Sequence, residues 1–378
     1  MSGGISIGLS IAGLCLWIGA LVVLLTSTIV SVVRHPRLGP TSTPGTLPSL
    51  ALIRPIAGVE HRMEAVTQSV LNQDHPDLDI VFAVSSERDP ALAMLHRLTH
   101  DHPDRCRIVF GQWQANRNPK LNNMVGGIEA CSAEYLFFSD GNTLLYPDSA
   151  RRWQGEAMAV GGIVSALPEG VDPHSAAAWV ECAFLNQHHL RLGLTLTWMG
   201  VPIVHGKAMM VSRQQFEALG GVAALSRYPA EDFAMAQAAK ANRIPVRLSN
   251  ATARTPLGAR SWRAMISRQR RWAQLRATSA PVSLVAEFLA AMVPSGLAGA
   301  MACAVLWPEA LWFALLGHGL VWLSCDAIVA KLRGQVISAW TPLASLGREV
   351  LIPVVLVAGA LKTQISWGGE VFSAKPRG

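Results

Sequence analysis

The sequence predicts an α/β domain with a mainly parallel sheet, flanked by transmembrane helices. Between residues 49 and 110, short apolar runs of strand length alternate with segments of helical spacing, as in α/β proteins. Apolar residues concentrate at both ends of the 378-residue chain and leave a more polar middle. Hydrophobic residues make up 51% of the chain and charged residues only 15%, which indicates membrane association.

The N-terminal segment, residues 1–37, is predicted to be a retained transmembrane helix. Ile5 to Val33 contains no charged residue, is long enough to cross a bilayer and is too long for a signal-peptide core. Arg34, His35 and Arg37 follow, so this end should face the cytoplasm. Residues 38–48 are rich in Pro, Thr, Ser and Gly and are interpreted as a linker.

Residues 49–278 are predicted to form the α/β domain. Ligands of such sheets bind at the carboxyl ends of the strands, so the loops after the strands should carry the chemistry. The predicted strands are Ser49–Ile53, Asp79–Val84, Arg107–Phe110, Tyr135–Phe138, 160–167 and 204–211, and the first predicted helices are Met63–Leu71 and Ala91–His100.

Polar residues follow several of these strands. Asp89 follows the second strand, Lys120 lies in the segment Asn118–Asn123 beyond the third, and Asp140 and Asn142 follow Tyr135–Phe138. An acid at the end of a strand, with another oxygen ligand two residues later, can hold a divalent cation against a diphosphate. The usual arrangement has two acids, and an ordinary Asp-Gly-Asn turn is the alternative interpretation.

The stretch from Tyr228 to Trp272 carries adjacent carboxylates at one end and a basic cluster at the other. Glu231 and Asp232 open a helix-like run, and Arg268-Gln-Arg-Arg-Trp272 precedes a long apolar stretch. A carboxylate base with cations that stabilise a departing phosphate suits group transfer from a phosphate-bearing donor. The alternative is a capped helix followed by a basic anchor at the membrane edge.

The histidines carry weaker signals. His205 could face an acceptor, although a lone histidine is more often structural. His188 and His189 are adjacent, and adjacent positions on a helix do not face one site, so no metal site is predicted there.

Residues 279–378 are predicted to return to the membrane. Val282–Leu306 and Leu311–Ala330 should form a helical hairpin with basic flanks on the inside. Leu351–Leu361 is too short to span, and we expect an interfacial or re-entrant helix. The tail Trp367–Gly378 should lie in the cytoplasm.

The charge and the cysteines narrow the function classes. The formal net charge of +7, with many arginines beside apolar spans, favours lipid or phosphate partners over nucleic acid, for which basic residues would alternate with aromatic ones. None of the six cysteines lies in a Cys-x-x-Cys pair. We expect buried, reduced thiols in a reducing, cytoplasmic setting, with neither a zinc site nor a disulfide framework.

The ordered motifs resemble those of a known family. Asp89, Asp140, Asp232 and Arg268-x-x-Arg271-Trp272 are similar to the D, D, D, (Q/R)xxRW pattern of ceramide glucosyltransferases, which form glycosyltransferase family 21. Further similar segments are Arg54-Pro55 with Gly58-Val59-Glu60, residues 118–123 and residues 230–233. The resemblance covers Leu50 to Arg276 and implies a Rossmann-like GT-A fold.

The resemblance also implies roles for residues. Asp232 would be the catalytic base, and Arg268, Arg271 and Trp272 would bind the departing diphosphate. Asp140 and Asn142 would hold Mg²⁺ or Mn²⁺. The residues implied to bind the donor nucleotide are Pro55, Glu60, Asp89, Lys120 and Asp140.

The implied activity is inverting transfer of one sugar from a UDP-sugar to the primary hydroxyl of ceramide. The protein would be a multi-pass protein of a bacterial inner membrane with its catalytic domain in the cytoplasm. A hopanoid glycosyltransferase that uses UDP-N-acetylglucosamine would have a similar chain. A processive polysaccharide synthase shares the (Q/R)xxRW pattern but normally needs more spans than the three or so found here, and a non-catalytic membrane scaffold would not need the base.

Overall fold

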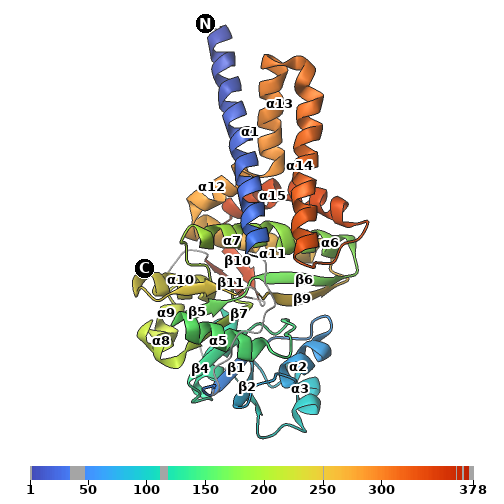
Figure 1. Cartoon of the computed structure of the whole chain (residues 1–378). Coiled ribbons are helices and arrows are strands. Elements are labelled where there is room, and N and C mark those ends of the chain that lie inside the picture. Colours follow the sequence, from blue (N-terminus) through green and yellow to red (C-terminus); the bar gives the residue numbers. More distant parts are fainter. Residues whose placement is uncertain are drawn as a thin grey trace. The chain divides into compact units, whose positions relative to one another are not determined.

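The computed structural model comprises two compact units, whose elements are labelled in Figure 1. The sheet unit comprises Pro36–Asp172, Leu196–Gly258 and Ser366–Gly378, and the helical unit comprises Met1–His35, Pro173–Thr195 and Ala259–Ile365. The residues that the structure describes are 2–34, 47–110, 118–249, 251–362, 364–367 and 370–373. His35, Arg37, most of the predicted linker and part of the predicted tail lie outside these ranges.

The core of the sheet unit is a seven-stranded sheet with the order β3-β2-β1-β4-β7-β5-β8. The β7 strand is antiparallel to both β4 and β5, and the other pairs are parallel, which confirms the prediction of a mainly parallel α/β sheet. The strands are β1 (Leu50–Ile56), β2 (Leu78–Val84), β3 (Cys106–Phe110), β4 (Tyr135–Ser139), β5 (Ile163–Ser165), β7 (Ala208–Ser212) and β8 (Val246–Leu248).

Helices cover both faces of this sheet because its buried strands are apolar on both sides. Alternate residues of β1 point to opposite faces: Leu50 and Leu52 pack in one hydrophobic cluster, and Ala51 and Ile53 pack in the other. The first cluster includes α2 (Met63–Leu71), α3 (Leu92–Thr99) and α5 (Ser149–Val160). The second includes α4 (Pro119–Glu129), α8 (Arg213–Ala218), α9 (Gly221–Leu225) and α10 (Glu231–Ala241).

Two of the predicted strands are shorter than expected. The run 160–167 forms a strand only at Ile163–Ser165, because α5 extends to Val160 and ends at Gly161, whose φ is +60°. The run 204–211 becomes regular only at Ala208. A separate two-stranded sheet pairs β6 (Pro168–Pro173) with β9 (Ala253–Gly258).

The helical unit contains the apolar helices of the chain. The helices α1, α13 and α14 lie side by side (Figure 1), and Trp17 Nε1 of α1 donates to His318 Nδ1 of α14 at 2.9 Å. The helices are α1 (Ser2–Val33), α6 (Ala176–Ala183), a π-helix (Phe184–His189), α7 (Leu190–Trp198), α11 (Trp262–Ser279), α12 (Pro281–Leu289), α13 (Met292–Leu306), a short 3₁₀ turn (Pro308–Ala310), α14 (Leu311–Leu332) and α15 (Thr341–Ala360). The chain then forms β10 (Gln364–Trp367) and β11 (Glu370–Ser373).

Within the described residues, three helical segments are long and apolar enough to cross a membrane. They are Ile7–Val33, Pro308–Leu332 and Thr341–Ala360, and a fourth span is possible if α12 and α13 act together. The apolar character expected for the two ends of the chain is therefore found in helices of membrane-spanning length.

The apolar run Val282–Leu306 is not the single helix that we predicted. It forms α12 and α13, which are bent by 53° relative to each other. Ala291 is extended, and the Met292 N–H donates to Glu349 Oε2 at 3.0 Å instead of continuing α12. Pro294 lies in the first turn of α13, where its missing N–H costs no helical hydrogen bond.

The predicted short helix Leu351–Leu361 is also wrong in its extent, because α15 begins at Thr341 and has 20 residues. Arg348 and Glu349 can be buried on this helix because Arg348 forms ion pairs with Asp326 and with Glu349. Arg348 Nη2 lies 2.8 Å from Asp326 Oδ2, and Trp322 Nε1 donates to Glu349 Oε1 at 3.0 Å. By length and composition this helix is a candidate span.

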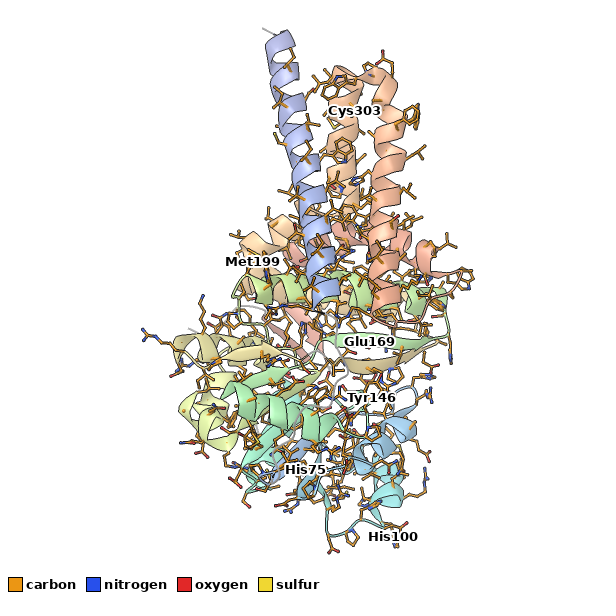
Figure 2. All side chains as sticks on the ribbon, viewed as in Figure 1. His75, His100, Tyr146, Glu169, Met199 and Cys303 are labelled. Atoms are coloured by element: carbon orange, nitrogen blue, oxygen red, sulfur yellow. The ribbon has the colours of Figure 1, made fainter. Side chains whose placement is uncertain are left out.

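No disulfide joins the six cysteines, all of which lie in described residues. Cys182, Cys303 and Cys325 are buried, and Cys303 lies on α13 (Figure 2). Cys15 is exposed on α1 and Cys106 and Cys131 are half-buried, so the prediction that every cysteine is buried holds only for the other three. The Cys15 thiol lies among other exposed residues of α1, many of them apolar.

The packing of α15 against α11 generates a prediction about stability. A Cβ atom at Gly359 would lie 2.5 Å from Ala273 Cβ and 3.0 Å from the Gln274 nitrogen, so Gly359→Ala should push the two helices apart. We expect it to lower the free energy of unfolding by about 1–3 kcal/mol, as overpacking does. Thermal unfolding in detergent measures this change.

Gly319→Ala in α14 is the matched control, since no atom lies within 4 Å of its added Cβ. This substitution should leave the unfolding temperature unchanged or raise it, because alanine favours helices. Equal unfolding temperatures for the two variants would show that Gly359 is not a close-packing position.

Candidate active site

Four segments of the sheet unit meet around one lysine. Asp140 follows the carboxyl end of β4, Lys120 lies in the first turn of α4, Glu231 opens α10, and Gly206 precedes β7. Lys120 Nζ lies 2.6 Å from Asp140 Oδ1 and 2.5 Å from Glu231 Oε1, and it donates to the Gly206 carbonyl at 3.0 Å. The structure therefore brings the predicted residues Lys120 and Asp140 into direct contact.

Lys120 lies on a helix and not on the loop that we predicted. Asn118 is the N-cap of α4, where its side chain accepts hydrogen bonds from the Lys120 and Leu121 N–H groups, and Pro119 occupies the first helical position. Asn before Pro is a recognisable helix start, so this sequence signal was available. The Asn118 amide also donates to Glu231 Oε2 at 2.9 Å and thereby joins α4 to α10.

The charges in this cluster control one another. Burial lowers the pKa of Lys120, but the charges of Asp140 and Glu231 outweigh that effect and hold this pKa above its ordinary value. Burial raises the pKa of Asp140, and Lys120 and Lys207 reverse the shift to well below the usual range. For Glu231, burial together with the neighbouring charge of Asp232 leaves a raised pKa despite Lys120.

Lys207, which was not predicted as a site residue, is a second lysine in the cluster. Its Nζ lies 2.9 Å from Asp140 Oδ2 and donates to Asn142 Oδ1 at 2.5 Å. The Asn142 amide in turn donates to Glu60 Oε2 at 2.7 Å. The predicted residues Glu60, Asp140 and Asn142 are thus joined in one chain of contacts through Lys207.

Asp140 and Asn142 do not fit a divalent cation in this arrangement. Both oxygens of Asp140, and the one amide oxygen that Asn142 can offer a metal, contact ammonium groups. A cation bound there would meet these positive charges and only one carboxylate of the pair. Mg²⁺ or Mn²⁺ at this pair therefore remains a prediction from the family resemblance that these contacts do not support.

Asp232 is held differently from its neighbours. Its Oδ2 accepts from the Gly206 N–H at 2.9 Å, and its Oδ1 accepts from the Phe233 N–H at 2.7 Å. Among the ion pairs of the described residues, none includes Asp232. A Cβ atom at Gly206 would lie 2.7 Å from Lys120 Nζ and 2.8 Å from Glu231 Oε1, so a larger residue here would displace the ends of these two side chains.

The other predicted donor-binding residues lie around the ends of β1 and β2. Asp89 Oδ2 accepts from the Gly58 N–H at 2.8 Å, and its Oδ1 accepts from the Ala91 N–H, so it ties the loop after β1 to the start of α3. The Pro55 carbonyl would lie 3.0 Å from a Cβ at Gly141, next to Asp140. Among the described residues, Asp89 forms no ion pair with Lys120 or Lys207. The His205 backbone N–H donates to Ser165 Oγ at 2.8 Å.

Arg54 is a buried cation close enough to be affected by the charge of Asp140, and no role was predicted for it from the sequence. Its side chain is fully buried, and Nη2 donates to the Thr143 carbonyl at 2.5 Å. Burial lowers the pKa of Arg54 to about 9, and the charge of Asp140 opposes this shift. An arginine inside a strand of otherwise apolar residues was the available signal.

Arg268, Arg271 and Trp272 lie on α11 in the helical unit. Arg268 Nη1 lies 3.1 Å from Glu181 Oε1, and Arg260 Nε lies 3.1 Å from the other oxygen of this fully buried carboxylate. The Trp272 and His189 rings are 5.1 Å apart.

The two adjacent histidines have separate partners within the helical unit. His189 Nε2 lies 3.0 Å from Gln269 Oε1 of α11, and His188 Nε2 lies 2.7 Å from Glu287 Oε1 of α12. Both histidines belong to the π-helix, so α-helical spacing did not anticipate their directions.

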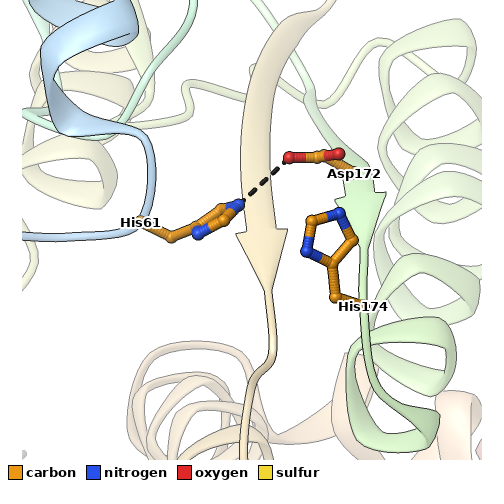
Figure 3. Close-up of side chains that lie close together, drawn as sticks. All are labelled: His61, Asp172 and His174. Atoms are coloured by element: carbon orange, nitrogen blue, oxygen red, sulfur yellow. Dashed lines mark hydrogen bonds and ion pairs between the residues drawn. The ribbon is translucent and has the colours of Figure 1, made fainter.

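A further polar contact in the sheet unit joins His61 to Asp172. His61 Nε2 lies 3.0 Å from Asp172 Oδ2 (Figure 3), and the Arg62 guanidinium also reaches this carboxylate at 3.3 Å. A Cβ at Gly258 would lie 2.5 Å from His61 Cγ, so β9 passes directly against the ring. These residues were not selected from the sequence.

Comparison with known proteins identifies the family. The sequence profile of Glycosyl transferase family 21 matches residues 15–378. The chain belongs to this family. The resemblance predicted from the motifs is therefore confirmed, and the protein is a glycosyltransferase.

Similar proteins include ceramide glucosyltransferases. Ceramide glucosyltransferase 1 of Caenorhabditis elegans is 25% identical over 350 residues, which cover 87% of this chain and 74% of the relative. A ceramide glucosyltransferase of Pyricularia oryzae is 22% identical over 438 residues, which cover 90% and 87%.

The fold is shared with a solved glycosyltransferase. The mannosyltransferase PcManGT from Pyrobaculum calidifontis, in complex with GDP-Man and Mn²⁺, has a TM-score of 0.50 and 18% identity. The match covers 94% of this chain and 98% of that one. The predicted GT-A class of fold is thus confirmed.

The two roles of Asn118 can be separated by substitution. Asn118→Ala removes the N-cap of α4 and the hydrogen bond to Glu231, whereas Ser212→Ala removes only the N-cap of α8. Each should lower the free energy of unfolding by about 1 kcal/mol. Only Asn118→Ala should also reduce glycosyl transfer, by about a hundredfold, because it misplaces Glu231 and Lys120.

Chemical denaturation and initial rates of transfer measure the two effects. If both variants transfer sugar at the same rate, the hydrogen bond between Asn118 and Glu231 has no part in organising the site.

Proposed function

We propose that this glycosyltransferase moves one sugar, with inversion, from a UDP-sugar to the primary hydroxyl of ceramide. Family membership supports sugar transfer, and the names of the similar proteins support ceramide as the acceptor. The apolar helices support a site that works at a membrane surface, where a lipid can present its hydroxyl.

The environment of Asp232 is the observation that carries the proposal. Two carboxylates of the cluster, Asp140 and Glu231, contact ammonium groups, whereas the Asp232 carboxylate accepts hydrogen bonds from the backbone N–H groups of Gly206 and Phe233. A carboxylate that is oriented by backbone donors and forms no ion pair with a lysine can accept a proton from a hydroxyl. We therefore assign the base role to Asp232.

The proposed reaction is a single displacement. Asp232 takes the proton of the ceramide hydroxyl while the hydroxyl oxygen forms a bond to the anomeric carbon of the sugar. The bond between that carbon and the diphosphate oxygen breaks, and its electron pair leaves with UDP. Attack from the face opposite the leaving group inverts the anomeric carbon.

The leaving diphosphate needs fixed positive charge. Lys120 would lie near the nucleotide or its phosphates, and Arg268, Arg271 and Trp272 are proposed to bind the departing group. Pro55, Glu60, Asp89 and Asp140 are proposed to form the rest of the donor site, and His205 to face the acceptor. None of these steps depends on a divalent cation at Asp140 and Asn142.

The alternatives differ in the acceptor or in the number of transfers. A hopanoid acceptor would use the same base and donor site, so a product assay has to distinguish it from ceramide. A processive synthase would need more spans than the three or four candidates in the described residues support.

The basic residues after α1 support a catalytic domain on the cytoplasmic side.

Asp232→Asn tests the proposed base. The purified chain in nanodiscs is offered a panel of UDP-sugars with ceramide or with a polyhydroxylated hopanoid, and mass spectrometry detects the products. We expect hexosylceramide from the unaltered protein. Loss of the base should reduce its rate by about a hundredfold to ten-thousandfold, while UDP binding and the unfolding temperature remain.

Asp101→Asn, at an exposed carboxylate, is the control and should keep full activity. Product on the hopanoid alone would keep the mechanism and change the acceptor. Full turnover by Asp232→Asn would exclude this residue as the base.

A further inference from the structure

The backbone pairing of β4 and β7 fixes Lys207 opposite Asp140. These strands are antiparallel, with Ser139 paired to Ala208, so the next positions along the pair are Asp140 and Lys207. The Asp140 N–H donates to the Lys207 carbonyl at 3.3 Å, which continues the ladder by one residue. Lys207 is therefore placed by the sheet itself and not by a loose loop.

The side chain of Lys207 reaches the two predicted metal ligands. Its Nζ contacts Asp140 Oδ2 at 2.9 Å and Asn142 Oδ1 at 2.5 Å. The side chain is only 13% exposed, so its ammonium is held in one place and poorly screened by solvent. Lys120 approaches the other oxygen of Asp140 at 2.6 Å. Two ammonium groups thus lie where a divalent cation was predicted.

We propose that Lys207 is a donor-binding residue whose ammonium, together with that of Lys120, supplies the positive charge for the nucleotide diphosphate at Asp140 and Asn142. This inference rests on the proposed use of a nucleoside diphosphate sugar. Asp140 and Asn142 then orient the ammonium, in place of holding a metal ion. A lysine is a compact point charge that suits a phosphate group.

We therefore expect this enzyme to bind a nucleoside diphosphate without a divalent cation. When the Lys207 ammonium is removed, binding of the nucleoside diphosphate should become dependent on a metal ion. Lys207→Met would leave Asp140 Oδ2 and Asn142 Oδ1 without the lysine, and such oxygens are the ligands that Mg²⁺ and Mn²⁺ prefer. A metal ion could then replace the lost charge.

The test is the affinity of the full chain in nanodiscs for UDP, measured by titration calorimetry in EDTA, in Mg²⁺ and in Mn²⁺. For the unaltered protein, we expect the three dissociation constants to agree within about threefold. Lys207→Met should bind UDP about tenfold or more weakly in EDTA and recover in Mn²⁺. Lys207→Arg keeps the charge and should retain binding in EDTA.

Lys240→Met, on the exposed end of α10, is the matched control and should behave as the unaltered protein does. Unfolding temperatures show whether each variant is folded. Binding of UDP by the unaltered protein only when Mg²⁺ or Mn²⁺ is present would overturn the inference and leave the proposed function standing. Equal affinities of Lys207→Met and the unaltered protein in EDTA would also overturn it. Folded protein that binds UDP under no condition would instead overturn the proposed UDP-dependent transfer, and the inference with it.

Discussion

The arrangement of the sheet unit depends on the buried ammonium of Lys120. Asp140 and Glu231 are both largely removed from water, and two buried carboxylates so close together would repel each other without a cation between them. The lysine satisfies both and also bonds the Gly206 carbonyl. Four segments that are distant in the sequence must therefore meet at one point, and the absence of a side chain at Gly206 allows them to do so.

The helical unit applies the same physical rule to its basic motif. The Glu181 carboxylate is fully buried, and Arg260 and Arg268 approach its two oxygens. His189 contacts Gln269, the residue after Arg268 on α11, and lies against Trp272. Arg268 and Trp272 thus have structural partners within this unit, as buried polar groups generally do. The fold therefore already orients the two side chains for which the family resemblance implies a role in binding a diphosphate.

The sequence predicted the features that depend on local pattern. The apolar strands and the acid after β4 follow from hydrophobic runs and from the rule that ligands bind where strands end. It could not predict contacts that depend on tertiary pairing. Lys207 meets Asp140 only because β7 runs antiparallel to β4, and His188 and His189 reach their partners only because the helix is π-helical there. The break between α12 and α13 depends on Glu349, which lies far away in the sequence.

The amide at position 142 follows from the same network. Asn142 accepts a hydrogen bond from Lys207 through its oxygen and donates one to Glu60 through its nitrogen. An aspartate would keep the first contact, but it has no N–H to donate and would place a second negative charge 2.7 Å from the Glu60 carboxylate. The departure from the usual pair of acids is therefore consistent with Lys207 opposite Asp140: where the protein supplies its own cation, a neutral side chain that can both accept and donate fits better than another carboxylate.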